Sequence, residues 1–264
     1  MSQPARAKLS VLIPAGNEER HIADCIASAR FADEVVVVND AASTDRTREI
    51  AEGLADRVLV HEYVNSAAQK NWAIPQMTHP WVLVVDSDER VTPRLRTEIE
   101  AVLAADGPAD GYRIYRLNHF MGQPIRGCGW QRDDVLRLFR RDIAKYEDKH
   151  VHADIVFPGK ADACVEHLSG KFLHYTFESF DQYLSKFFKY GEWAAEDRAQ
   201  KTPVVKWGHI AGRPIWRFFR QFVMYGGWRD GKAGFIICAM AAFSVLLKYA
   251  RVWEKRQREA PGRE

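Results

Sequence analysis

The sequence predicts an α/β protein in which a mostly parallel, Rossmann-like sheet is flanked by helices and followed by a helical extension. Three observations lead to this prediction. Short apolar runs alternate with segments of helical periodicity in the first third of the chain, and acidic residues follow several of these runs. Residues 201–264 contain 13 Lys and Arg against 4 Asp and Glu, whereas residues 1–200 contain 25 against 31. We therefore expect an α/β domain over 1–200 and a basic, aromatic extension over 201–264.

Strands and helices are expected in alternation through residue 105. The Val-rich run 34–40 is typical of a central parallel strand, because such strands are buried on both faces. The other strands are expected over 9–14, 56–63 and 81–89, and the helices over 17–30, 42–55, 67–77 and 91–105. Further along, strands are expected over 111–122, 133–142 and 165–177, and a helix over 180–201. Ligands of parallel α/β sheets bind at the carboxyl ends of the strands, so a site is expected there.

The composition excludes several classes of protein. With 47% hydrophobic and 28% charged residues, the chain of 264 residues is neither disordered nor collagen-like. Its four cysteines are scattered and have no metal-binding spacing, which favours a reducing, cytoplasmic setting. The first 20 residues lack the apolar core of a secretory signal, so no secretion is expected.

The basic extension combines arginine with aromatic and apolar residues. Residues 213–232 mix Arg with Trp, Phe and Tyr, and residues 234–247 are 14 residues without a charge. A helix of that length reaches only about 21 Å, short of a hydrocarbon core of roughly 30 Å. A capping core helix or an in-plane helix at a membrane surface is therefore expected, rather than a span. The apolar block argues against a nucleic-acid partner.

Acidic residues close two of the expected strands. Asp86 and Asp88 lie at the end of the expected strand 81–89, and Asp40 ends the expected strand 34–40. Carboxylates at such positions suit Mg²⁺ or Mn²⁺, which take one or two carboxylates together with substrate phosphates. Solvated turn residues are the simpler alternative for each of them. His174 is either a structural residue of its strand or a contact to metal or phosphate.

Five short motifs follow one another along the chain: PAGNEER (14–20), DAASTDRT (40–47), AQKN (68–71), VVDSDERVTP (84–93) and DDVLRLFRR (133–141). Each motif alone is weak, but together and in this order they resemble those of the family 2 glycosyltransferases, which have a GT-A nucleotide-sugar-binding fold. The resemblance covers about residues 8–175.

The resemblance implies roles for individual residues. Those implied to border the nucleotide are Pro14, Asn17, Glu18, Asp40 and Lys70. Asp86 and Asp88 are implied to hold the metal and diphosphate, with His174 as a further candidate metal contact. Asp133 fits the position of the catalytic base, with Asp134 beside it and Asp148 as a rival.

Within that family the sequence is most similar to bacterial β-glucosyltransferases of the lipopolysaccharide core. This similarity implies an inverting transfer of glucose from UDP-glucose to a lipid-linked glycan, by an enzyme peripheral on the inner face of the cytoplasmic membrane. A polyprenyl-phosphate sugar synthase of the same fold is an alternative. A non-catalytic nucleotide-sugar-binding protein is another, since Ala42 and Ala153 replace residues usual in the motifs.

Overall fold

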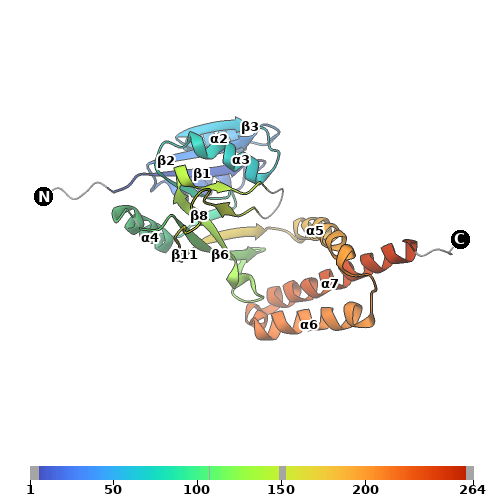
Figure 1. Cartoon of the computed structure of the whole chain (residues 1–264). Helices are drawn as coiled ribbons and strands as arrows, with labels where there is room; N and C mark the ends of the chain where they lie inside the picture. Colours follow the sequence, from blue (N-terminus) through green and yellow to red (C-terminus); the bar gives the residue numbers. More distant parts are fainter. Residues whose placement is uncertain (1–5, 107, 149–152, 260–264) are drawn as a thin grey trace. The chain divides into compact units, whose positions relative to one another are not determined.

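A computed structural model of the chain describes residues 6–106, 108–148 and 153–259 (Figure 1). The described residues form two compact units. The first lies within Met1–Arg116 and Asp133–His174, and the second within Leu117–Arg132 and Tyr175–Glu264. The domain boundary after residue 200 stays a prediction, because this division concerns compactness and assigns residues 117–132 to the second unit.

One mixed sheet organises the first unit. Its parallel part has the order β3 (Arg57–His61), β2 (Glu34–Asp40), β1 (Leu9–Ala15), β4 (Trp81–Val84). The order continues through β8 (Asp134–Arg140), β6 (Gly111–Phe120), β11 (Val165–Phe177) and β5 (Glu89–Val91), and β7 (Gln123–Pro124) pairs with β6. Strand β8 is antiparallel to β4 and to β6. A separate two-stranded sheet joins β9 (Lys145–Tyr146) to β10 (Ile155–Val156).

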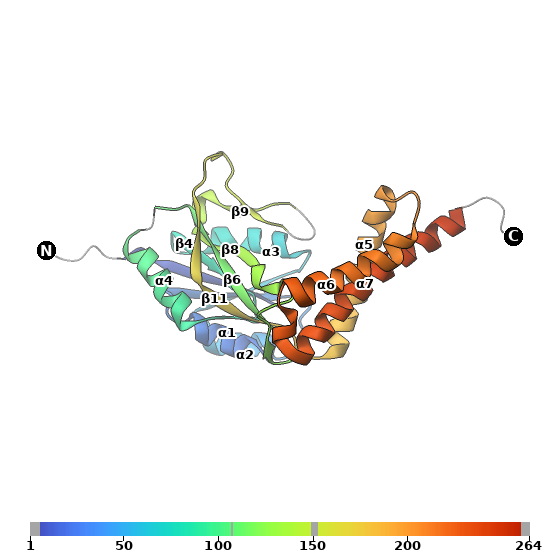
Figure 2. The same ribbon diagram turned by 90° about the horizontal axis from the view of Figure 1, so that it is seen from below.

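Alternation along the strands supplies two hydrophobic cores, one on each face of the sheet. Leu9, Val11 and Ile13 of β1 pack with α1 (Ile22–Ala29) and α4 (Pro93–Ala104). Leu12 of the same strand belongs to the other core, with α3 (Ser66–Ala73) and the short helix η1 (Ile74–Gln76). Helix α2 (Thr47–Leu54) adds Ala51 to the first core. Figure 2 shows this unit from below.

Two sequence predictions are corrected here. The expected single strand over 81–89 ends at Val84, because the Glu89 N–H donates to the Asp86 carbonyl (2.8 Å) and the Glu89 carboxylate accepts the Asp86 N–H (3.0 Å). The chain turns there, and Glu89–Val91 pairs with β11 instead. The expected helix over 17–30 starts only at Ile22, since the preceding residues form turns. Both corrections place polar residues in loops at the sheet edge.

The second unit is mainly helical. It contains α5 (Phe180–Lys201), α6 (Arg213–Phe219), which is flanked by π-helical turns η4 (Gly208–Gly212) and η5 (Arg220–Met224), then η6 (Gly227–Asp230) and α7 (Gly231–Glu259). Figures 1 and 2 both show α6 beside α7. Helix α7 has 29 residues, about twice the 14 used in the sequence argument, because it continues through charged residues after Leu247.

The stretch Gly227–Arg258, which contains most of α7, is long and apolar enough to cross a membrane by length and composition. Among the described residues it is the one such stretch. The expectation of no membrane span depends on a helix of 14 residues, and this length does not apply to α7, which has 29 residues.

Asp230 joins the two glycine-rich segments of the second unit. Its carboxylate is 5% exposed and accepts the backbone N–H groups of Arg126 (2.9 Å) and Gly127 (2.7 Å). A Cβ on Gly127 would lie 2.5 Å from the Gly226 carbonyl oxygen, so only glycine permits this approach. The glycine-rich segments GCGW (127–130) and GGW (226–228) therefore have a structural role in this unit.

Candidate active site

A cleft of about 380 Å³ opens at the carboxyl ends of the parallel strands. It lies entirely within the first unit, at the edge where β1, β2 and β4 end. Six of the predicted site residues line it: Pro14, Glu18, Asp40, Asp86, Asp88 and His174. The other lining residues are Ala15, Gly16, Tyr63, Ser66, Gln69 and Ser87.

The loop after β1 is fixed by Asn17, which acts on the backbone rather than in the cleft lining. Asn17 has a left-handed backbone (φ 56°), a conformation that asparagine tolerates better than most residues. Its side-chain oxygen accepts the N–H of Thr44 at 2.9 Å. The neighbouring Glu18 N–H donates to Thr47 Oγ1 at 2.6 Å. These bonds tie the first loop to the turn after β2 and orient Glu18.

Asp40 ends β2 and organises the turn that follows. Its Oδ1 accepts the N–H groups of Ala42 (3.1 Å) and Tyr63 (3.2 Å). Ala42, which replaces a residue usual in the motif, stands in this turn. The carboxylate of Asp40 keeps the turn closed with alanine in place, and Asp40 still reaches the cleft.

Asp86 is the most strongly paired carboxylate of the cleft. Its Oδ1 accepts a hydrogen bond from Lys70 Nζ at 2.9 Å, and its Oδ2 contacts the guanidinium of Arg137. Lys70 and Arg137 are themselves 5% exposed. Burial alone would raise the pKa of Asp86, but Arg137 and Lys70 outweigh it and hold that pKa well below its usual range. Asp86 is therefore an anion with both oxygens already in ion pairs.

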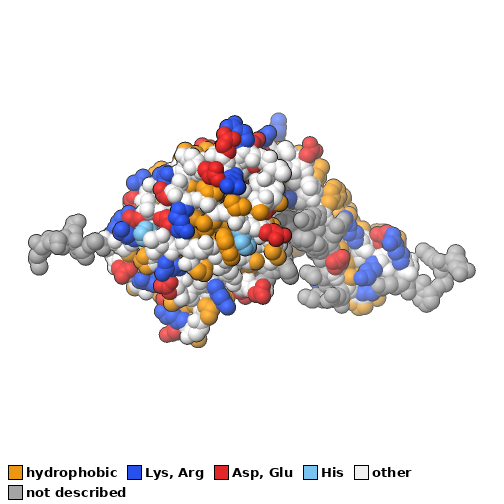
Figure 3. All heavy atoms as spheres, turned by 90° about the horizontal axis from the view of Figure 1, so that it is seen from above, with side chains coloured by type: hydrophobic (Ala, Val, Ile, Leu, Met, Phe, Trp, Pro, Cys, Tyr) orange, Lys and Arg blue, Asp and Glu red, His pale blue; other side chains and the backbone are white. Residues whose placement is uncertain are grey.

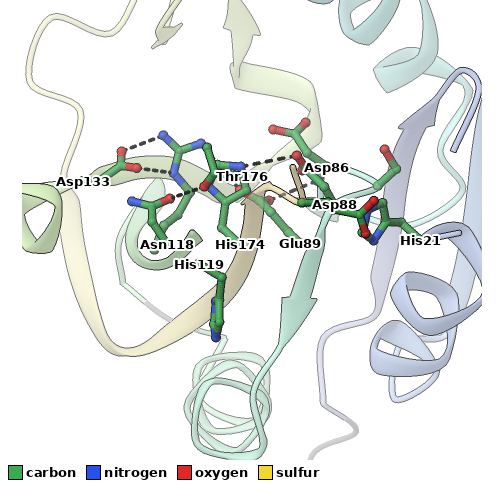
Figure 4. Close-up of polar contacts among 12 residues, drawn as sticks. His21, Asp86, Asp88, Glu89, Asn118, His119, Asp133, His174 and Thr176 are labelled. Carbon is green, nitrogen blue, oxygen red and sulfur yellow. Dashed lines mark hydrogen bonds and ion pairs between the residues drawn. The ribbon is translucent and has the colours of Figure 1, made fainter. Parts of the chain in front are cut away.

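The ion pairs continue from Asp86 toward Asp133 through buried side chains (Figure 4). Glu89 is fully buried, and its Oε1 lies 3.7 Å from Arg137 Nη2 and 3.6 Å from Arg116 Nη1. Burial raises the pKa of Glu89, an effect that Arg137 partly offsets. Arg116 in turn donates two hydrogen bonds to the Asp133 carboxylate, of 3.0 and 2.6 Å. Charges of alternating sign thus link the cleft to the predicted base.

The two predicted catalytic carboxylates are held by different arginines. Asp134 accepts from Arg113 Nε at 2.5 Å and lies 3.3 Å from His167 Nε2. Burial would raise the pKa of Asp134, but the bonds from Arg113 and His167 lower it overall. Neither Asp133 nor Asp134 is among the residues that line the cleft. Asp148 stands next to residues 149–152, which lie outside the described part of the chain.

Asp88 and His174 are paired with each other in the cleft. His174 Nε2 lies 3.4 Å from Asp88 Oδ2, and both residues line the cleft. Two protein ligands suffice for a cation that substrate phosphates also bind. Among the described residues, no group of three or more His, Cys, Asp or Glu side chains could hold a metal by itself. Asp86, which the sequence also proposed as a ligand, is engaged by Lys70 and Arg137 instead.

Sequence reasoning identified Lys70 but missed the two arginines that neutralise the acids of this site, Arg116 and Arg137. It also missed the buried acid Glu89 that lies between them. Arg137 lies within the motif DDVLRLFRR. A usable signal was present: Arg137 stands between Leu136 and Leu138 in an apolar strand, and a buried arginine requires acidic partners.

Comparisons with known proteins agree with this architecture. Residues 10–150 match the family described as Glycosyl transferase family 2. The chain is 28% identical over 258 residues to the lipopolysaccharide core biosynthesis glycosyltransferase LpsC of Rhizobium meliloti, covering 96% of this chain and 94% of that protein.

Two solved structures are similar to this chain at lower sequence identity. TarS 1-349 of S. aureus in complex with UDP-GlcNAc is 16% identical, with 97% of this chain and 93% of that chain covered and a TM-score of 0.48. The mannosyltransferase PcManGT of Pyrobaculum calidifontis, in complex with GDP-Man and Mn²⁺, is 18% identical, with coverages of 98% and 77% and a TM-score of 0.46.

Proposed function

The chain belongs to glycosyl transferase family 2, and we propose that it transfers a sugar from a nucleotide-diphosphate sugar to a hydroxyl group of a lipopolysaccharide core or related surface glycan. That it is a glycosyltransferase with the GT-A fold follows from the family match and the sheet. The acceptor class is supported by the similarity to LpsC over nearly the whole chain. The single observation that carries the proposal is the acid-lined cleft at the ends of β1, β2 and β4.

The cleft suits a nucleotide donor, for which UDP-glucose is our first choice by resemblance. Its volume of about 380 Å³ falls in the usual range of small-molecule sites. Asp40 and Glu18 present carboxylates that accept hydrogen bonds from a base or ribose. Lys70, 5% exposed and bound to Asp86, adds positive charge beneath the position proposed for the diphosphate.

We assign the proposed Mg²⁺ or Mn²⁺ to Asp88 and His174, with Asp86 in a supporting role. When bound, the cation would neutralise the diphosphate so that it can leave the anomeric carbon. Asp86 holds Lys70 and Arg137 in place, and these two cations add to the positive charge of the site. The pairing of Asp86 supports Asp88 as the carboxylate with capacity for a metal.

Asp133 is our proposed general base, in a single inverting displacement without a covalent intermediate. It would take the proton of the acceptor hydroxyl as the hydroxyl attacks. The two hydrogen bonds from Arg116 fix the orientation of this carboxylate.

The acceptor class also implies a location. We propose that the protein works in the cytoplasm, at the inner face of the cytoplasmic membrane, where a lipid-linked glycan is accessible. The excess of basic residues over 201–264 supports this location.

A thermal-shift panel of nucleotide sugars, with Mn²⁺ or with EDTA, tests the donor site. We expect stabilisation by one nucleotide sugar that is strong with Mn²⁺ and weak with EDTA. The Asp88→Asn variant should lose the Mn²⁺-dependent part. No stabilisation by any nucleotide sugar would contradict the proposed donor site.

The Asp133→Asn variant separates hydroxyl transfer from the alternatives. We expect turnover to fall by roughly 10²–10⁴-fold with the donor-induced thermal shift retained. Full turnover on a polyprenyl phosphate would favour the alternative synthase, because a phosphate acceptor needs no strong base. Donor binding without turnover in the wild-type protein, on any tested acceptor, would favour a non-catalytic binding protein.

A further inference from the structure

An exposed apolar face runs along α6 and the turns that flank it. Ile215, Trp216, Phe219 and Val223 are 69%, 54%, 47% and 48% exposed. Ile215, Phe219 and Val223 follow at intervals of four, so they lie on one side of the helical segment, with Trp216 beside them. The opposite side packs inward, because Pro214 and Gln221 are buried and Phe218 and Phe222 contact Phe235 of α7.

Two further exposed tryptophans flank the α6 segment in the sequence. Trp207 is 82% exposed and Trp228 is 61% exposed, so three of the eight tryptophans, with Trp216, lie on the surface between residues 207 and 228. Tryptophan and phenylalanine in such numbers are costly on a surface that meets only water. We call Trp207, Ile215, Trp216, Phe219, Val223 and Trp228 together the aromatic face.

The segment that carries the aromatic face is positively charged throughout. Residues 206–229 include five basic residues, namely Lys206, Arg213, Arg217, Arg220 and Arg229, and no acidic residue. Surfaces of the first unit differ, because acidic and basic side chains are interspersed on the side of β3 and α3 (Figure 3). A partner of the aromatic face must therefore combine apolar groups with negative charge.

We propose that the aromatic face inserts, in the plane of the membrane, into the headgroup layer of an anionic lipid bilayer. Tryptophan and phenylalanine would enter the boundary of the acyl chains, and Lys206 and Arg229, which are exposed, would meet lipid phosphates. This inference deepens the membrane location of the proposed function, since it names the surface that makes the contact and its depth.

Helix α7 is not the membrane-spanning element in this proposal, although its length would permit a span. Ile237, Cys238, Tyr249 and Val252 are at most 1% exposed, so one side of α7 is covered by the protein itself. The Arg213 guanidinium contacts Tyr249 Oη, which joins the α6 segment to α7. Lys248 and Arg251 also interrupt the apolar run. Helix α7 thus serves as the support on which the aromatic face is held.

Vesicle flotation of the full-length protein tests this inference. The vesicles contain either phosphatidylcholine alone or phosphatidylcholine with roughly one third phosphatidylglycerol, which gives the bilayer a negative surface charge. We expect binding to the anionic vesicles, and an Ile215→Asp, Phe219→Asp double variant should bind at least about tenfold less. Val64→Asp is the matched control, because Val64 is 68% exposed in the first unit and should bind as wild type does.

Two further measurements decide the mode of binding. Lipids brominated near the headgroup should quench the fluorescence of wild-type protein more than that of a Trp216→Phe, Trp228→Phe variant. Alkaline carbonate should release the protein from cell membranes. Retention after carbonate treatment would overturn the proposal in favour of a span by α7. Equal vesicle binding by the Ile215→Asp, Phe219→Asp variant would also overturn it.

Donor stabilisation, measured in the same variants without vesicles, separates this inference from the proposed function. The Ile215→Asp, Phe219→Asp variant should keep the nucleotide-sugar thermal shift of the wild type. A wild-type dimer in sedimentation that this variant abolishes, without any vesicle binding, would assign the aromatic face to a second copy of the chain and contradict the proposal. Vesicle binding without any donor shift would leave this inference standing and refute the proposed function.

Discussion

The two units of the molecule use their charges in opposite ways. In the first unit, acidic and basic side chains are paired with one another: Asp86, Glu89 and Asp133 alternate with Lys70, Arg137 and Arg116. In the second unit, the arginines of residues 213–229 stand among exposed aromatic side chains with no acidic residue between them. Charges paired inside a unit fix geometry, whereas unbalanced surface charge is available for a partner.

Removing one cation from the buried network should have the largest effect on stability. In Arg137→Met, Asp86 keeps Lys70, whereas Glu89, which is fully buried, loses a close positive neighbour. We expect the free energy of unfolding to fall by about 3–5 kcal/mol, as when one partner of a buried pair is removed. Urea denaturation followed by fluorescence measures it. Arg48→Met, which breaks an exposed pair with Glu52, should leave the midpoint unchanged.

Glu34 is a buried acid of the first unit whose contribution to stability depends on pH. Burial would raise its pKa, but hydrogen bonds from Ser10 and Thr78 outweigh burial and lower the pKa to about 2. The stabilisation from a depressed acid is present above its ordinary pKa and is lost as pH falls from about 4.5 to 2, amounting to about 3 kcal/mol.

The Glu34→Gln variant should therefore be less stable than wild type at pH 6 and should lose less stability between pH 4.5 and 2. Chemical denaturation at a series of pH values measures both differences. Parallel curves for the two proteins would show that Glu34 does not titrate with folding.

Among the side chains of the second unit whose burial the structure describes, Asp230 is the one buried acid. Asp230→Asn keeps one acceptor oxygen, so one of the N–H groups of Arg126 and Gly127 loses its partner. We expect a loss of about 1–2 kcal/mol in the free energy of unfolding. The control Asp181→Asn changes an exposed acid of the same unit and should not move the midpoint. An equal loss in both variants would remove the special role of Asp230.

The parts of the fold that follow from local pattern were predictable. The run 34–40 is buried as expected of a central strand, and Ile22, Cys25, Ile26 and Ala29 form the buried side of α1. The turn at Asp86–Glu89 was not predictable, because it depends on a bond between the side chain of Glu89 and the backbone of Asp86. The apolar residues 81–85 do not themselves indicate that the strand ends at Val84.

The acids of the site and Lys70 were predictable from the sequence, whereas the two arginines were not. Strand ends mark Asp40, Asp86 and Asp88, because parallel topology brings those ends together. Arg116 and Arg137 come from β6 and β8, which are distant in sequence from Asp86 and join the sheet by antiparallel pairing. Only the sheet order brings them beside Glu89 and Asp86, so a single sequence gives little sign of their partners.

The most direct test of the central claim is a crystal structure with UDP and Mn²⁺, located by its anomalous scattering. The account predicts Mn²⁺ bound to Asp88 and His174 and to both phosphates of UDP, with Asp86 still paired to Lys70 and Arg137. Mn²⁺ or UDP bound away from the cleft at the ends of β1, β2 and β4 would contradict it.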